Sequence, residues 1–92
     1  MRINFYATLR AAVGQKSVDL PLPDGTSVRD LAHEIARRWP AMAERIFDAE
    51  GEISRQVHFM IGGRNVRWLP EGSETPLSSG DIIDVFPPTA GG

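Results

Sequence analysis

Apolar and polar side chains alternate along the first residues of the chain. Between residues 2 and 9 every second position is apolar, and these positions are Ile3, Phe5, Ala7 and Leu9. A period of two is typical of a strand with one buried face. After a turn at residues 13–15 the alternation returns over residues 18–22, where Pro21 suits an edge strand. The two segments predict an antiparallel hairpin near the N-terminus.

A period of three to four residues replaces the alternation in the next segment. Apolar residues recur in this way from Val28 to Trp39, and charged residues occupy the other side. Such a stripe predicts a helix that packs on a sheet. Thr26 or Ser27 can cap its first turn, because Asp30 follows Ser27 at the spacing of a weak capping box.

A proline separates this helix from a shorter second piece. Pro40 would end the main helix, and it can also open a short helical segment that reaches Phe47. Residues 57–61 then alternate again. Two glycines at residues 62–63 are a hairpin signal, so residues 64–66 are expected to return as a short strand.

The last predicted strand, residues 82–86, completes the order strand, strand, helix, strand, short strand, strand. A hairpin followed by a right-handed helical crossover places this strand beside the first, as its parallel neighbour at the centre of a mixed sheet. We therefore expect an α+β fold of the β-grasp, or ubiquitin-like, type. It would have four to five strands and one main helix on one face. The domain would span residues 1–86, and residues 87–92 would form a flexible tail.

Chain length and net charge limit the classes of function that we expect for this protein. A chain of 92 residues forms one domain that is too short for a cleft between two lobes, so we do not expect a self-sufficient enzyme. The formal net charge of −2 argues against a nucleic-acid partner. The sequence resembles neither a signal peptide nor a membrane span, which predicts a cytoplasmic protein without a membrane partner.

Reactive side chains are scarce. The chain has no cysteine, which removes disulfides, thiolate catalysis and thiolate metal sites together. His33 and His58 have no ligand partner at metal spacing, so no metal site is proposed. The sequence contains no glycine-rich phosphate loop of a known type, and we expect the chain itself to bind no cofactor.

The strongest chemical signal is the C-terminal tail. Its residues are Pro87, Pro88, Thr89, Ala90, Gly91 and Gly92. The two prolines have a fixed φ and would hold the tail off the domain, whereas the two glycines have no Cβ and can thread a narrow channel. The reactive group would be the α-carboxylate of Gly92. The alternative is a frayed terminus that ends in two glycines by chance.

An apolar face is expected beside the start of this tail. In the predicted sheet Tyr6, Phe86 and Met60 project to the same outward side, together with Asp84. An exposed apolar cluster next to a reactive tail is a candidate docking surface for a partner protein. In the alternative arrangement a loop such as residues 68–79 would cover Tyr6 and Phe86.

The opening and the end of the chain resemble a known family. The resemblance rests on three segments. They are residues 5–10, with the sequence FYATLR, the helix from Val28, and residues 79–92, which run from SGD to FPPTAGG. These features are similar to the ubiquitin-like sulfur carriers, which include the molybdopterin synthase small subunit, the thiamine sulfur carrier and the archaeal small modifiers. The segment of residues 39–53 is similar to the extended form in archaeal modifiers and in bacterial carriers that supply sulfur for cysteine synthesis.

The resemblance implies activation by partners. An E1-like adenylating enzyme would use ATP and Mg²⁺ to join AMP to Gly92, and a sulfur donor of the cysteine desulfurase or rhodanese type would displace the AMP. The product would be a C-terminal thiocarboxylate. Tyr6, Arg10, Met60 and Phe86 would contact the partner, and Arg10 is a stronger candidate than Arg64 or Arg67 because it follows the family-like opening.

Several functions are compatible with this chemistry. The first is a sulfur carrier for cofactor biosynthesis of the molybdopterin synthase small subunit type, for which the large subunit of that synthase would be a further partner. The alternatives are a sulfur donor for cysteine or thiamine biosynthesis, and a protein modifier that forms isopeptide bonds with target lysines. A β-grasp interaction module with an inert tail is the remaining reading.

Overall fold

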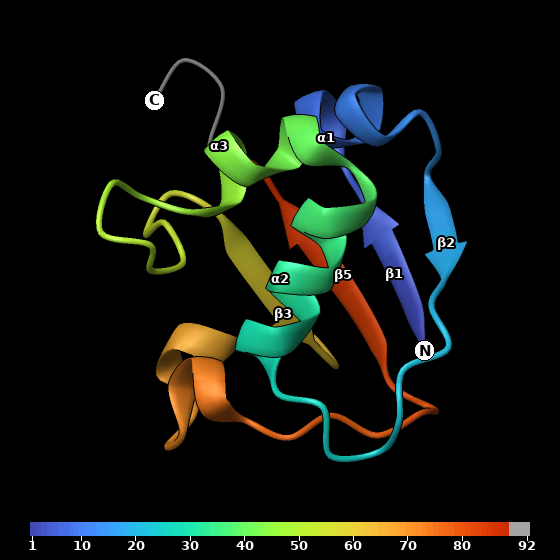
Figure 1. Ribbon diagram of the computed structural model, residues 1–92. Helices are drawn as coiled ribbons and strands as arrows, with labels where there is room; N and C mark the ends of the chain where they lie inside the picture. The colour runs from blue at the N-terminus through green and yellow to red at the C-terminus, as the bar shows by residue number, and fades with distance from the viewer. Residues whose placement is uncertain (89–92) are drawn as a thin grey trace.

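The computed structural model describes residues 1–88, which form a mixed sheet with its helices on one face (Figure 1). The strands are β1 (Arg2–Phe5), β2 (Ser17–Asp19), β3 (His58–Ile61), β4 (Arg64–Asn65) and β5 (Ile82–Phe86). The α-helices are α1 (Ala7–Val13), α2 (Val28–Arg38) and α3 (Ala43–Ile46). Three short 3₁₀ segments complete the described elements: η1 (Pro40–Met42), η2 (Val66–Trp68) and η3 (Gly72–Glu74).

The sheet has the predicted β-grasp topology. Its strand order is β2-β1-β5-β3-β4. The strands β1 and β5 are parallel, with Phe5 beside Val85, and the other neighbours are antiparallel. The expectation of a central parallel pair in a mixed sheet is therefore confirmed, and the arrows of β1 and β5 point the same way in Figure 1.

The first strand is shorter than the alternation predicted. Residues 7–13 form α1, so the expectation of a strand through Leu9 is wrong. The ladder with β5 stops because the next donor on that strand would be Pro87, which has no N–H. The carbonyl oxygen of Tyr6 instead accepts hydrogen bonds from the amides of Leu9 and Arg10, at 3.1 and 3.4 Å. These bonds form the first turn of α1.

The hairpin glycines and the main helix lie where the sequence places them. The amide of Asp30 donates to the Ser27 hydroxyl at 3.0 Å, so Ser27 is the cap of α2. Gly62 and Gly63 have φ of 57° and 80°, which permits the tight turn between β3 and β4. The returning strand β4 ends one residue early, because Val66 begins η2.

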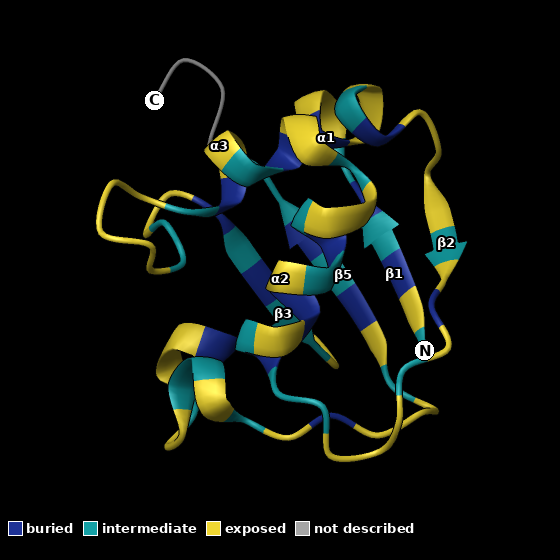
Figure 2. Cartoon of the chain, viewed as in Figure 1, coloured by how far each residue is buried: buried dark blue, intermediate teal, exposed yellow. Residues whose placement is uncertain are grey.

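The core lies between α2 and the inner face of the sheet (Figure 2). Every second residue of the central strands is fully buried, and the set comprises Ile3, Phe5, Ile83 and Val85. On α2 the predicted stripe is buried as well, at Val28, Leu31, Ala32 and Ile35. The segment after Pro40 adds Met42 and Ile46 to this core, as expected for a short helical piece with apolar contacts.

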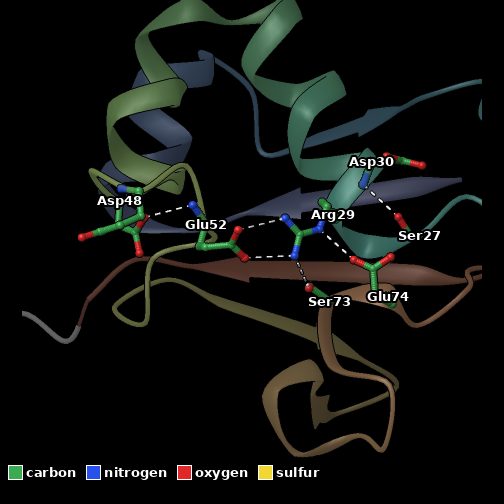
Figure 3. Close-up of polar contacts among 8 residues, drawn as sticks. Ser27, Arg29, Asp30, Asp48, Glu52, Ser73 and Glu74 are labelled. Carbon is green, nitrogen blue, oxygen red and sulfur yellow. Dashed lines mark hydrogen bonds and ion pairs between the residues drawn. The ribbon is translucent and has the colours of Figure 1, made fainter.

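A cluster of polar side chains links two loops to α2 on the helical side of the sheet (Figure 3). Arg29, in the first turn of α2, donates to the Glu52 carboxylate through Nη2 at 2.9 Å and to Glu74 through Nε at 2.7 Å. Asp48 accepts the amides of Glu50 and Glu52 at 2.9 Å and shapes the first of these loops. The hydrogen bonds from Arg29 hold the pKa of Glu52 below its usual value.

None of the helices among residues 1–88 combines the length and the apolar character that a membrane crossing requires.

Substitutions of two neighbouring isoleucines of β5 test which face of the sheet each side chain occupies. Ile83 is fully buried, whereas Ile82 is 52% exposed on the other face. Ile83→Ala should lower the free energy of unfolding by about 2–5 kcal/mol, because it leaves a cavity in the core. Ile82→Ala should lower it by less than about 1 kcal/mol. Chemical denaturation measures both values, and equal losses would contradict the assigned faces.

Candidate functional site

The tail begins at the centre of the sheet. The strand β5 lies between β1 and β3, and Pro87 and Pro88 follow it directly. The last bond of the parallel ladder runs from the Tyr6 amide to the carbonyl of Val85 at 3.3 Å. The chain therefore leaves the domain at the end of the sheet where the central strands β1 and β5 both terminate.

Two aromatic rings stack at this point. The rings of Tyr6 and Phe86 have centroids 4.3 Å apart and an angle of 11° between their planes. Both residues are half-buried. Because Phe86 is the last residue of β5, the stack fixes the side chain that immediately precedes Pro87.

A chain of hydrogen bonds supports the stack from three strands. The Tyr6 hydroxyl and the Asn4 amide group both donate to Oδ1 of Asp84, at 3.0 and 2.9 Å. The Ser17 hydroxyl donates to Oδ1 of Asn4 at 2.6 Å, which extends the chain to β2. These hydrogen bonds hold the carboxylate of Asp84 beside the aromatic pair. The outward face of the sheet thus has polar side chains next to the apolar stack of Tyr6 and Phe86.

The same contacts shift the ionisation of the phenol. The pKa of Tyr6 is raised above its ordinary value of 10.0, mainly because its hydroxyl donates to Asp84. Partial burial and the negative charge of Asp84 act in the same direction, whereas the charge of Arg10 lowers the pKa. The Nε of Arg10 donates to the carbonyl of Phe5, the residue before Tyr6, at 3.4 Å.

A groove opens on this face at the base of the tail. Its lining comprises Tyr6, Ala7, Thr8, His58, Met60, Asn65, Phe86, Pro87 and Pro88. The predicted docking residues Tyr6, Met60 and Phe86 thus come together in one depression. The predicted Arg10 is exposed on α1, outside the lining.

The loop of residues 68–79 does not cover the aromatic pair. It contributes no residue to the lining of the groove, and its segment η3 packs against α2 on the helical side of the sheet. The alternative arrangement, in which this loop would hide Tyr6 and Phe86, is therefore wrong.

Sequence reasoning did not place Thr8, His58 and Asn65 at this site. His58 is the cross-strand partner of Phe86, and its Nδ1 lies within hydrogen-bond distance of the Asn65 amide nitrogen, at 3.1 Å. The signal for His58 was present, because it alternates with the inward Phe59 just as Met60 does. The alternation also put Thr8 on the outward side with Tyr6, but on a strand, whereas in the structure Thr8 lies on α1.

Four of the predicted tail residues fall outside the described part of the chain. They are Thr89, Ala90, Gly91 and Gly92. Pro87 and Pro88 are described, and both line the groove.

Titration of the phenol tests the hydrogen-bond chain. Tyr6 is the single tyrosine, so phenolate absorbance reports on it alone. The midpoint should lie above 10.0, and Asp84→Ala should lower it, because this change removes both the acceptor and the charge. Asp81→Ala is the matched control, since Asp81 bonds to the Ser78 amide. A midpoint that is the same in Asp84→Ala and the wild type would contradict the arrangement.

Comparisons with known proteins agree on the family. The ThiS family model matches residues 3–92. Small archaeal modifier protein 3 of Haloferax volcanii is 36% identical over 92 residues, which cover 100% of this chain and 98% of that protein.

Two solved structures are similar to the whole chain. Small archaeal modifier protein 1 of Methanosarcina acetivorans has a TM-score of 0.80 at 31% identity, with 99% of this chain and 94% of that one covered. A putative molybdopterin converting factor subunit 1 of Pyrococcus furiosus has a TM-score of 0.75 at 29% identity, with 96% and 95% covered. With the β-grasp sheet and the family match that extends to residue 92, the chain belongs to the ThiS family of ubiquitin-like sulfur carriers.

Proposed function

We propose that this protein is a sulfur carrier whose Gly92 carboxylate is activated by a separate adenylating enzyme. A sulfur donor of the cysteine desulfurase or rhodanese type then converts it to a thiocarboxylate. The observation that carries the proposal is the family match over residues 3–92, because it includes the Gly-Gly end. The protein would act as a co-substrate of partner enzymes.

The chemistry explains why a partner is required. A free carboxylate is a poor electrophile at neutral pH. When a carboxylate oxygen attacks the α-phosphorus of ATP, pyrophosphate leaves and the carbonyl carbon acquires AMP as a leaving group. The outer sulfur of a donor persulfide can then displace AMP, and a second thiol of the partner would cleave the resulting S–S bond, which leaves the thiocarboxylate and a disulfide on the partner. The phosphates need Mg²⁺ and positive groups in a dry pocket, which the partner would supply.

The groove at the base of the tail is the proposed docking site. An enzyme that takes Gly92 into its active site must hold the domain a few residues away, and the aromatic pair lies at this position. Half-buried aromatic side chains are typical anchors of protein interfaces. Met60 would extend the contact across the groove, and Arg10 would meet an acidic group at its margin.

The molybdopterin synthase small subunit type is our first assignment for the sulfur acceptor. The likeness to the Pyrococcus furiosus protein supports it, because that protein is named as a putative molybdopterin converting factor subunit. The acceptor would then be a pterin precursor held by the large subunit of the synthase. Sulfur donation for cysteine or thiamine biosynthesis would use the same thiocarboxylate with a different acceptor.

Protein modification is the second candidate function. The observation in its favour is the full-length relative at 36% identity, which is named as a small archaeal modifier. In this function the activated carbonyl of Gly92 would form an isopeptide bond with a lysine of a target protein. The adenylation step is the same, and the two functions differ only in the nucleophile that displaces AMP.

The intact mass of the protein from its native cell distinguishes these functions. A carrier should show a mass increase equal to the replacement of one oxygen by sulfur, and a Gly92-deleted version should lack it. A modifier should instead show lysine-linked adducts at higher mass. An unmodified mass with no adducts, under conditions in which the protein is active, would contradict both.

Variants of the aromatic pair test the docking site. Tyr6→Ala and Phe86→Ala should each weaken binding to the adenylating enzyme of the same cell by about tenfold or more, as truncated aromatic anchors do. Ile82→Ala is the matched control, because Ile82 lies on the same face at the other end of β5. Calorimetric titration measures the affinities. An unchanged affinity of Phe86→Ala, with its fold intact, would refute this site.

A further inference from the structure

A second hollow, the side pocket, lies on the helical side of the sheet, away from the groove at the base of the tail. Its volume is about 250 Å³. Buried apolar side chains form its floor, and they are Val28, Val57, Phe59 and Val66. Sites for drug-sized ligands have volumes of roughly 300–1,000 Å³, so the side pocket suits a single apolar side chain.

Two loops form the walls of the side pocket, and Arg29 links them. Glu52 belongs to one wall and Ser73 to the other. The Nη2 group of Arg29 donates to the Glu52 carboxylate at 2.9 Å and to the Ser73 hydroxyl at 3.4 Å (Figure 3). Its Nε donates to Glu74, the neighbour of Ser73, at 2.7 Å. These contacts fix the two walls relative to each other before any ligand binds.

The mouth of the side pocket carries a net positive charge. Arg55 and Arg67 line it and are exposed, and no ion pair found among residues 1–88 involves either of them. Arg29 pairs with Glu52 and with Glu74, so these three groups together have a charge of −1 against the +2 of the two free arginines. A carboxylate would therefore be attracted to this mouth.

Arg67 is held in place at the mouth by two hydrogen bonds. Its Nη2 group donates to the backbone carbonyl of Arg55, and its amide donates to Oδ1 of Asn65 at 2.9 Å. The other guanidinium N–H groups form a fork that matches the two oxygens of a carboxylate. Arg67 directly follows Val66 of the floor. A ligand that fills the pocket and reaches Arg67 must therefore carry its carboxylate close to its apolar group.

We propose that the side pocket binds the C-terminal residue of a partner protein that ends in an aliphatic side chain. The side chain lies on the apolar floor, and the terminal carboxylate accepts hydrogen bonds from Arg67, with the charge of Arg55 beside it. A C-terminal residue has both groups on one Cα, which agrees with the adjacent positions of Val66 and Arg67. Capture of a terminal carboxylate is a recurring mode of peptide recognition. The C-terminus of a second copy does not fit this description, because Gly92 has no side chain.

Short peptides test this proposal on the unaltered full-length protein. The probe is acetyl-Ala-Ala-Leu with a free carboxylate, added to isotope-labelled protein and followed by NMR. We expect saturable shifts of the Val57, Val66 and Arg67 amides, with a dissociation constant of about 1 mM or tighter. The amides of Tyr6 and Phe86, which mark the groove at the base of the tail, should not move.

Two matched peptides separate the contributions of the charge and the side chain. The same peptide with an amidated C-terminus should bind about fivefold more weakly, because it lacks the carboxylate that contacts Arg67. Acetyl-Ala-Ala-Gly with a free carboxylate should also bind about fivefold more weakly or less tightly still, because it leaves the apolar floor uncovered.

A pair of arginine variants tests the residue that receives the carboxylate. Arg67→Gln should weaken the leucine peptide about fivefold and remove its preference over the amidated form. Arg64→Gln is the matched control, because Arg64 is exposed on β4 but lies outside the lining of the side pocket. This control should bind as the wild type does.

Three results would overturn the proposal. They are the absence of saturable shifts up to about 10 mM peptide, equal affinities of the free and amidated leucine peptides, and shifts confined to Tyr6 and Phe86. All three concern the wild-type protein, so a folding defect in a variant cannot produce them. The experiment involves no activation of Gly92, and its failure would leave the proposed carrier function unaffected. Failure of adenylation in the cell would likewise not change the peptide titrations.

Discussion

The parallel pairing of β1 with β5 is the contact on which the rest of the molecule depends. It joins the two ends of the chain, with Asn4 beside Asp84 in the register. On the inner face these strands bury the centre of the core against α2. On the outer face they bring Tyr6 beside Phe86 and so build the base of the tail. One pairing thus determines both the stability of the domain and the place at which Pro87 leaves the sheet.

Pro87 marks the limit of this pairing and has two consequences. Because it has no N–H, it cannot extend the ladder, and the carbonyl of Tyr6 turns to the amides of α1. The same residue releases the chain from the sheet. The end of the strand, the start of α1 and the start of the tail therefore have one physical cause, and the aromatic stack lies at the point where they meet.

The features predicted correctly from the sequence depend on local rules. The strand Ile82–Phe86, the cap at Ser27 and the turn at residues 62–63 each follow from a short pattern, and the crossover rule converts their order into the topology. The error at residues 7–9 has a different origin. Ala7 and Leu9 fit a period of two, but the absence of a donor at Pro87 is a property of the neighbouring strand.

The site was predictable only in part for the same reason. Alternation placed Tyr6, Met60 and Phe86 on one face. It also put Thr8 on that face, but as part of a strand, whereas this residue reaches the groove through α1. The hydrogen bonds that converge on Asp84 come from residues that are distant in sequence, and a single sequence carries no signal for them.

The central claim is that the α-carboxylate of Gly92 is the group that is activated. In this account the domain presents that carboxylate to the adenylating enzyme. The most direct test is the exchange of labelled pyrophosphate into ATP by the adenylating enzyme of the same cell. The account predicts that exchange requires the full-length chain and stops when Gly92 is deleted, although the shortened protein keeps its fold. Equal exchange with the deleted chain would contradict the account.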